Sequence, residues 1–353
     1  MRRLAMASLL ILGCFDWDVL SSTLNEPDLS VSDDLAMADL KEPDLGPSDL
    51  RTPDLLPPPD LSLPVISFTR QDVTALGGKK PNNALFGWNA TNLTAVGDGG
   101  VVAKTIDGKT WTLVTLGVAT TQSLNDVWFF DASNGWIVGS GPTAYQWNGL
   151  AWTANSAALT NDVFGVFGSA TSKVVAAGSA DAIFRSDGTN WTKSNNIAPK
   201  PATQNGVWGI GSTFFSVGAS DDCINVTDTT IGRLSCSQAG GAALRSVWGF
   251  SASNILTVGY DNNTSIASKS NGTVWSKVNN VPNIGKLYAV WGASATDIWV
   301  GGEGGQIMRH DGTNWTRVTV MGIPNTEVIK DIWGADANNI WLLTDVGSIY
   351  KKN

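Results

Sequence analysis

The sequence is poor in the residues that most enzymes use for acid–base, nucleophilic and metal chemistry. It holds one histidine, His310, and three cysteines in 353 residues. A Ser-His-Asp triad would depend on that single imidazole, and no His/Cys cluster has the spacing of a zinc site. Gly97–Gly100 and Gly301–Gly305 fit hairpin turns better than phosphate-binding loops. His310 itself precedes an Asp-Gly turn, at the position that Ser186 occupies in another repeat, and we expect a structural role for it.

Charged side chains are also few, at 15% of the residues, and they are unevenly distributed. The formal net charge of the chain is −8, yet residues 15–64 hold twelve acidic residues against Lys41 and Arg51. With Arg2 and Arg3 at the start, residues 65–353 are left close to neutral. A neutral domain lacks the basic footprint of a nucleic-acid-binding protein, so the sequence argues against a nucleic-acid partner.

Residues 1–13 have the pattern of an export signal. Two arginines precede an apolar core from Leu4 to Leu12, which is too short to span a bilayer as a helix. The run Leu10-Ile11-Leu12-Gly13-Cys14 resembles the lipobox of bacterial lipoproteins, which implies that Cys14 carries a diacylglycerol. Phe15 in place of aspartate implies, by the same resemblance, the outer membrane; the leaflet stays open. The alternative is an ordinary secretory signal with a chance cysteine.

Residues 14–64 are expected to be a disordered tether. The tripeptide Pro-Asp-Leu recurs there, beginning at Pro27, Pro43, Pro53 and Pro59. Proline, repelling acidic charge and the lack of aromatic residues after Trp17 leave too little apolar surface to offset the entropy of ordering. Acidic Pro-Asp-Leu linkers behind a lipobox resemble those of myxobacteria and related deltaproteobacteria.

Residues 65–353 contain an internal repeat, clearest in Ala289–Val318. One unit has four short apolar runs between turn residues, which predicts a four-stranded antiparallel meander. Asp311-Gly312 predicts a type I′ hairpin, because both central residues of that turn need positive φ. The first run of each unit carries an anchor aromatic, 39 to 43 residues from the next: Phe86, Trp128, Phe167, Trp208, Trp248, Trp291 and Trp333. A four-stranded period near 40 predicts an all-β, seven-bladed β-propeller.

The last repeat stops after its third strand. The apolar run Val65–Val73 precedes the first anchor and belongs to no complete unit. We expect it to supply the missing fourth strand and so close the ring, which removes an exposed sheet edge.

The motif Asp/Asn-Gly-x-x-Trp, as in Asp311–Trp315, is one residue short of the Asp-box hairpin of sialidase-type propellers. Residues 65–353 resemble bacterial lipoprotein propellers built from VWG…DG..W repeats, and more distantly Asp-box and photosystem-assembly-factor-like propellers. The resemblance implies the fold and says little about activity, since propellers host unrelated functions. The arginine triad and tyrosine nucleophile of sialidases cannot be recognised here.

Blade 4 departs from the repeat, because Cys223 and Cys236 stand where the Asp-Gly hairpin is expected. If the turn centres near Thr229-Thr230, the two cysteines face each other across neighbouring strands. In an oxidising compartment, with Cys14 modified by lipid, they are expected to form a disulfide. Two reduced, buried thiols are the alternative.

Two further sets of residues are weak candidates for ligand contacts. Asp98, Glu303 and Asp345 each lie twelve residues beyond an anchor, in turns of neighbouring blades, and could together bind a cation such as calcium. Trp88 and Trp147 fall outside the repeat pattern and could stack on a ligand such as a sugar. Apart from that calcium candidate, no cofactor is expected.

The loops of the two rims differ in how well they repeat. The turns between first and second strands, and between third and fourth, repeat closely, whereas the loops of the other rim vary in length and content. Because variable loops on a rigid scaffold usually carry recognition, we expect the binding face on that second rim. The sequence favours a non-enzymatic scaffold for a protein or an envelope polymer. A carbohydrate-binding propeller is the alternative, and a glycosidase or lyase with a loop-built site is a third.

Overall fold

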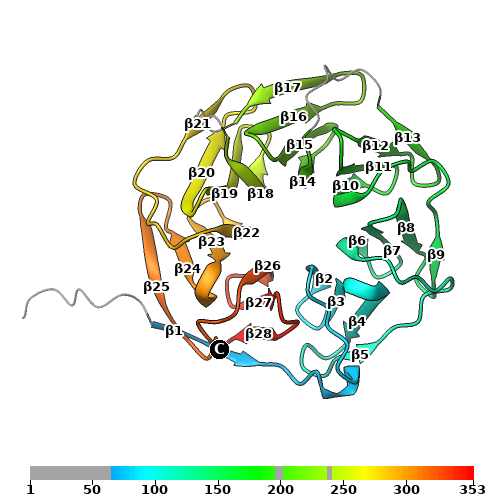
Figure 1. The fold of residues 1–353 in the computed structure, drawn as a ribbon, viewed down its shortest axis with the longest axis horizontal. Coiled ribbons are helices and arrows are strands. Elements are labelled where there is room, and N and C mark those ends of the chain that lie inside the picture. The colour runs from blue at the N-terminus through cyan, green and yellow to red at the C-terminus, as the bar shows by residue number, and fades with distance from the viewer. Residues whose placement is uncertain (1–64, 195–201, 237–240) are drawn as a thin grey trace, which may run out of the picture. The chain divides into compact units, whose positions relative to one another are not determined.

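The computed structural model describes residues 65–194, 202–236 and 241–353. These residues form a closed ring of seven antiparallel blades, with the first strand of each blade innermost (Figure 1). The prediction of a seven-bladed β-propeller is therefore confirmed. The export signal at 1–13, Cys14 and the tether at 14–64 lie outside the described residues and stay predictions.

Five blades are separate four-stranded sheets, and the remaining two share one eight-stranded sheet. Blades 1 to 3 consist of β2 (Ala84–Asn89), β3 (Asn92–Gly97), β4 (Val101–Thr105) and β5 (Thr112–Leu113); β6 (Leu124–Asp131), β7 (Asn134–Gly139), β8 (Thr143–Trp147) and β9 (Trp152–Ala154); and β10 (Val163–Ala170), β11 (Lys173–Gly178), β12 (Ile183–Ser186) and β13 (Trp191–Lys193). Blades 4 and 5 consist of β14 (Gln204–Ile210), β15 (Thr213–Gly218), β16 (Asp222–Val226) and β17 (Ile231–Ser235); and β18 (Ala243–Ser251), β19 (Asn254–Asp261), β20 (Thr264–Ser270) and β21 (Trp275–Lys277). Blades 6 and 7 consist of β22 (Leu287–Ser294), β23 (Asp297–Gly302), β24 (Ile307–His310) and β25 (Trp315–Met321); and β26 (Ile329–Asp336), β27 (Asn339–Thr344), β28 (Ile349–Lys352) and β1 (Val65–Arg70).

Three short 3₁₀ turns complete the described elements: η2 (Thr74–Leu76), η3 (Asp98–Gly100) and η4 (Glu303–Gly305). The last two lie between the second and third strands of blades 1 and 6. Within the described ranges, no helix is both long and apolar enough to cross a lipid bilayer.

Strand β1 closes the ring as expected, and it also pairs with a strand of blade 6, which the repeat does not predict. Its second half pairs antiparallel with β28, with Phe68 opposite Lys352, and completes blade 7. Its first half pairs parallel with β25, with Val65 opposite Thr319. The second pairing exists because β25 runs on to Met321, well beyond the short outer strands of blades 1 to 3. A single N-terminal strand therefore joins blade 6 to blade 7.

The anchor aromatics form contacts from blade to blade around the ring. The ring centroids of Phe86 and Trp128 are 4.3 Å apart, and those of Trp128 and Phe167 are 3.9 Å apart. The glycine after the anchor makes room for the ring of the preceding blade, because a Cβ atom at Gly249 would lie 2.6 Å from Trp208. The aromatic-Gly dipeptide is thus a packing unit between blades.

Replacing Gly249 with alanine is expected to lower the free energy of unfolding by about 1–3 kcal/mol, because the added methyl group forces the Trp208 ring out of its place. Urea unfolding followed by tryptophan fluorescence measures the change. Gly232→Ala is the control, since a Cβ atom there meets nothing within 4 Å. Equal midpoints for the two variants would rule out the packing role.

The outer hairpins differ from the predicted type I′ turn. The side chain of the first turn residue accepts hydrogen bonds from two later backbone N–H groups: Asp311 Oδ1 lies 2.8 Å from the Thr313 nitrogen and 2.7 Å from the Asn314 nitrogen. Only the glycine of this turn has positive φ, +95° at Gly312. The prediction was wrong because aspartate acts here as a side-chain acceptor outside the two-residue loop and not as one of its central residues.

Candidate functional site

Seven side chains surround one end of a cavity on the axis of the propeller. Each blade contributes one, from the start of its innermost strand or, at Asn83, from the residue just before it. Each lies three residues before an anchor aromatic, and the set is Asn83, Asn125, Phe164, Asn205, Arg245, Tyr288 and Lys330. All seven line a cavity of about 150 Å³ on the axis. Each innermost strand runs from one of these seven residues to its anchor aromatic. The anchor aromatics therefore lie deeper along the axis and form the floor of the cavity.

The asparagines of this ring have a structural role. Asn83, Asn125 and Asn205 each donate from Nδ2 to a backbone carbonyl of the next blade, at 2.9, 2.8 and 2.7 Å. These bonds tie neighbouring inner strands together and repeat with the blade period. Blades 5, 6 and 7 have Arg245, Tyr288 and Lys330 in place of this asparagine. In blades 1, 2 and 4 the same position makes the blade-to-blade bond.

Arg245, Tyr288 and Lys330 form a cluster with two residues of the same rim, Tyr260 and Lys286; we call these five residues the cationic cluster. Arg245 Nη2 donates to the Tyr260 hydroxyl, and the guanidinium lies 5.2 Å from the Tyr260 ring centroid. Lys330 Nζ lies 4.8 Å from the Tyr288 ring centroid, and Lys286 Nζ lies 5.5 Å from that of Tyr260. Cation–π contacts of this length stabilise the charged groups partly, without neutralising them.

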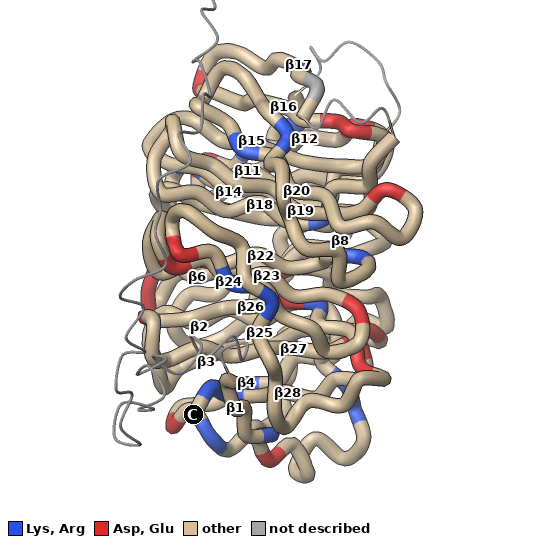
Figure 2. The backbone as a smooth tube through the Cα atoms, turned by 90° about the vertical axis from the view of Figure 1, so that its left-hand side faces the viewer, with Lys and Arg blue, Asp and Glu red and all other residues tan. Residues whose placement is uncertain are grey.

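The electrostatics of the cluster follow from its enclosure. Burial lowers the pKa of Lys330, and the neighbouring positive charge of Arg245 lowers it further, against the opposing effect of Asp345 and Asp98. Burial also raises the pKa of the Tyr288 hydroxyl. Figure 2 shows acidic and basic positions scattered along the chain of the propeller.

The three carboxylates predicted as a cation site are not brought together. Among the described residues, no group of three or more His, Cys, Asp or Glu side chains could hold a metal ion. Asp98 accepts from Asn82, Asn83 and Ser123, and these bonds lower its pKa. Glu303 lies 3.5 Å from Lys286 Nζ, and Asp345 accepts the Val328 N–H. Each carboxylate is therefore bonded to a different segment that enters an inner strand, which spacing along the repeat could not show.

Two further carboxylates line the same cavity, one residue after the ring position. Asp126 Oδ2 accepts the Val166 N–H of the next blade at 2.7 Å, and Asp331 Oδ2 accepts the Leu85 N–H across the ring closure at the same distance. Burial raises the pKa of Asp126 to about 8 and that of Asp331 to about 7. Asp331 also contributes to the raised pKa of Asp126 through its charge. We did not anticipate these two residues from the sequence.

The two off-pattern tryptophans lie together on a different part of the propeller. Trp88 and Trp147 line one pocket of about 200 Å³ between blades 1 and 2, near the rim opposite the cationic cluster. Both are half-buried. Trp88 packs 4.9 Å from the Phe129 ring, and Trp147 is held by a hydrogen bond from Nε1 to the Ala132 carbonyl. Their convergence in one pocket is compatible with a stacking site.

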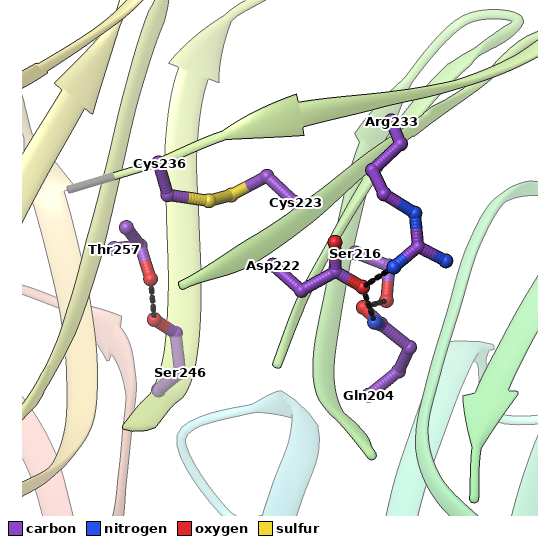
Figure 3. Close-up of a disulfide and its surroundings, with 8 residues drawn as sticks. All are labelled: Gln204, Ser216, Asp222, Cys223, Arg233, Cys236, Ser246 and Thr257. Carbon is purple, nitrogen blue, oxygen red and sulfur yellow. Dashed lines mark hydrogen bonds and ion pairs between the residues drawn. A yellow bond between two sulfur atoms is a disulfide. The ribbon is translucent and has the colours of Figure 1, made fainter. Parts of the chain in front are cut away.

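Cys223 and Cys236 are joined by a disulfide, with their Cα atoms 5.6 Å apart (Figure 3). The predicted register is off by one residue: the turn spans Thr227–Thr230, so Leu234 faces Cys223 and Cys236 lies diagonally beyond it. The turn is shifted because Thr227 Oγ1 accepts the Thr230 N–H at 2.9 Å and replaces the aspartate of other hairpins.

Beside the disulfide lies a buried polar network that the sequence did not reveal. Arg233 forms an ion pair with Asp222 at 2.7 Å, and Gln204 donates to Asp222 at 2.6 Å (Figure 3). Arg233 also forms an ion pair with Asp181 at 3.0 Å. These bonds tie the outer strand of blade 4 to its neighbours where the repeat tryptophan is missing.

Breaking this disulfide is expected to lower the free energy of unfolding by about 2–3 kcal/mol, because the open chain regains loop entropy. Urea unfolding with and without dithiothreitol measures the effect. The double variant Cys223→Ala/Cys236→Ala is the control, and its midpoint should not respond to the reductant. A wild-type chain that is equally insensitive would contradict the prediction.

His310 takes the role expected for its repeat position. Its Nδ1 accepts the Gly312 N–H at 3.1 Å, as Ser186 Oγ accepts the Gly188 N–H at 3.1 Å. Burial lowers its pKa. The imidazole is therefore a hairpin cap.

The cationic cluster was missed although a signal for it existed. Aligning the seven repeats on their anchors places Arg245, Tyr288 and Lys330 where three other blades have asparagine. These three residues lie at or near the loops that enter β18, β22 and β26, on the rim with the variable loops. That this rim is the binding face stays a prediction.

Comparison with known proteins identifies the fold only. No protein-family model matches the sequence, and no curated protein matches it. Among solved structures, YCF48 bound to a D1 peptide superposes with a TM-score of 0.65 at 15% identity, over 82% of this chain and 99% of that one. YCF48 from Cyanidioschyzon merolae gives 0.64 at 15% identity, over 80% and 98%. The WD40 propeller of Doa1 gives 0.63 at 11% identity, over 81% and 95%. This chain is therefore similar in architecture to β-propellers.

Proposed function

We propose that this chain is a non-enzymatic binding module that holds a protein partner at the rim of the cationic cluster. The observation that carries the proposal is the exchange of the blade-to-blade asparagine for Arg245, Tyr288 and Lys330 in three successive blades. The side-chain bond that asparagine makes to the next blade in blades 1, 2 and 4 is absent at these three positions, where half-buried cations and a tyrosine line the cavity. Solved structures include YCF48 with a bound D1 peptide, so a propeller of this architecture can hold a peptide.

The proposal includes export and a lipid anchor at Cys14. The acidic segment 14–64 would then act as a tether that holds the propeller away from the membrane of the cell envelope. Replacing Cys14 with serine should move the protein from the membrane fraction to the soluble fraction. Continued membrane association of the variant would reject the lipid anchor. The proposal includes no resident cofactor.

Affinity capture from detergent-solubilised envelope tests the binding role. The full-length chain should retain a stoichiometric protein partner, and the rim variant Tyr260→Ala/Lys286→Ala should lose it. A variant of the opposite rim, Lys109→Ala, is the matched control and should keep the partner. Capture that is unaffected by the rim variant, or no partner at all, would reject the proposal.

A carbohydrate-binding role is the second candidate, and the shared pocket of Trp88 and Trp147 favours it. Sugar rings stack on exposed indole faces, and Trp147 is already held in place by Ala132. A glycan array with the wild-type chain and the Trp88→Ala and Trp147→Ala variants tests this role. A glycan bound equally by all three proteins would exclude the pocket.

A further inference from the structure

Two cations of the cationic cluster are half-buried and lack carboxylate partners. Within residues 65–194, 202–236 and 241–353, neither Arg245 nor Lys330 has a carboxylate oxygen within ion-pair distance. Two cations of blade 6 are paired, by contrast: Arg309 lies 2.7 Å from Asp297, and Lys286 lies 3.5 Å from Glu303. Holding an unpaired cation away from bulk water is costly, so these two positions favour binding of an anion.

The size and lining of the cavity restrict that anion. A volume of about 150 Å³ is well below the roughly 300–1,000 Å³ of sites for drug-sized ligands. The indole rings of Trp208, Trp248 and Trp291 line its deeper part and give it apolar faces below the cationic mouth. Asp126 and Asp331 line the same cavity, and they accept the Val166 and Leu85 N–H groups and have pKa values that burial raises to about 8 and about 7. A single short chain with methylene groups and a terminal anion matches both regions.

Nearby carboxylates reduce the advantage that a doubly charged phosphate group would have over a singly charged anion. Asp98 and Asp345 lie close enough to Lys330 to influence its pKa, and Glu303 is paired with Lys286 on the same rim. These carboxylates lower the local positive potential, and the extra attraction of a dianion over a monoanion falls in proportion to that potential. The Tyr288 hydroxyl, which also lines the cavity, has no hydrogen-bond partner among the described residues and can donate one.

We propose that the cationic cluster recognises a carboxylate of the protein partner, carried by a glutamate side chain of an acidic segment that enters the channel mouth. Arg245 and Lys330 bind the carboxylate oxygens, Tyr288 donates to one of them, and the methylene groups contact the tryptophan floor. This inference rests on the proposed binding function and specifies the group that the site accepts.

Titration calorimetry with peptide probes tests the inference on the full-length chain in detergent. The probes are N-acetylated, C-terminally amidated hexaglutamate and hexaglutamine, hexaglutamine with a free C-terminal carboxylate, and inorganic phosphate. Hexaglutamate should bind at least about tenfold more tightly than amidated hexaglutamine, because only the former can pair with the two cations. Tighter binding of the free-carboxylate hexaglutamine would assign the site to a chain terminus and overturn the side-chain assignment, and tighter binding of phosphate would overturn the carboxylate.

Point variants test whether hexaglutamate binds at the cationic cluster. Arg245→Gln and Lys330→Gln should each weaken hexaglutamate binding by at least about tenfold, whereas Lys330→Arg should retain it. Lys277→Gln, at an exposed position of β21, is the control and should bind as the wild type. Urea unfolding confirms that each variant is folded. Unchanged binding by folded Arg245→Gln and Lys330→Gln would overturn the inference.

A failure of the carboxylate inference can be distinguished from a failure of the proposed binding function. If the partner is captured and is lost with Tyr260→Ala/Lys286→Ala, but hexaglutamate binds no better than hexaglutamine, the binding role stands and the carboxylate inference falls. If no partner is captured, the proposed function itself fails.

Discussion

The free energy of unfolding of the wild-type chain should fall as the pH rises between about pH 5 and pH 8, and the Asp126→Asn variant should show a much smaller fall. The physical cause is enclosure of the Asp126 carboxyl beside the channel, where burial raises its pKa to about 8 from an ordinary value of 3.8. Between these two values the folded chain holds a proton that the unfolded chain has released. Stability is therefore fully present below the unfolded pKa and is lost as the pH rises through the folded pKa.

The upper limit of the slope for one such group is about 1.4 kcal/mol per pH unit. We expect a smaller slope, because Asp126 borders a cavity of about 150 Å³ that can hold water. Asparagine removes the titration while keeping a carbonyl oxygen for the Val166 N–H. The Asp331→Asn variant should likewise show a smaller fall of unfolding free energy with rising pH than the wild type. For this residue the pH range of the effect ends near its own pKa of about 7.

Urea unfolding midpoints of the wild type and of Asp126→Asn, measured at several pH values, test this prediction. The matched control is Asp187→Asn, because backbone hydrogen bonds from Asn190 and Thr189 lower the pKa of Asp187. The stabilisation from that charge is fully present above the ordinary pKa of aspartate and is lost only as the pH falls below it, towards the lowered pKa of the folded state. The Asp187→Asn variant should therefore parallel the wild type above about pH 5. Parallel profiles for wild type and Asp126→Asn would show that the carboxyl stays ionised throughout.

Replacing Phe68 with alanine should lower the free energy of unfolding by about 3–5 kcal/mol. Phe68 lies at the centre of β1, is 3% exposed, and packs with Val318, Ile340 and Tyr350 in the core shared by blades 6 and 7. Its loss leaves a cavity at the strand that joins these two blades. The blades would then be held mainly by their inner strands.

Denaturant unfolding of Phe68→Ala measures this loss, with Val65→Ala as the control. Val65 belongs to the same strand and is 60% exposed, so its truncation should change the free energy of unfolding by less than about 0.5 kcal/mol. Similar midpoints for both variants would mean that β1 closes the ring through its backbone hydrogen bonds alone.

The architecture was predictable from the sequence because each blade repeats the same local rules. Short apolar runs between turn residues determine the strands, and the 39 to 43 residue spacing of the anchors determines the number of blades. A glycine follows six of the seven anchors and is also local in sequence, although its reason at Gly249 is the tryptophan of the preceding blade. The disulfide was predictable as a pair, since Cys223 and Cys236 stand where blade 4 lacks the Asp-Gly hairpin and its tryptophan.

The candidate site was not predictable to the same degree. Asp98, Glu303 and Asp345 share a repeat position, yet each is bonded to a separate segment that enters an inner strand. Equal spacing fixes the blade and rim of a residue but not its neighbours. Trp88 and Trp147 were chosen as departures from the repeat, and only the adjoining faces of blades 1 and 2 place them in one pocket.

By itself, then, the amino-acid sequence determined the all-β repeat, the seven blades, the closing strand and the cysteine pair, since these follow from local patterns and their period. Only the tertiary structure decided that Arg245, Tyr288 and Lys330, more than forty residues apart from one to the next, meet around one cavity. Closure of the ring brings the same position of successive blades side by side. A substitution that is unremarkable within its own blade thereby becomes part of a shared site.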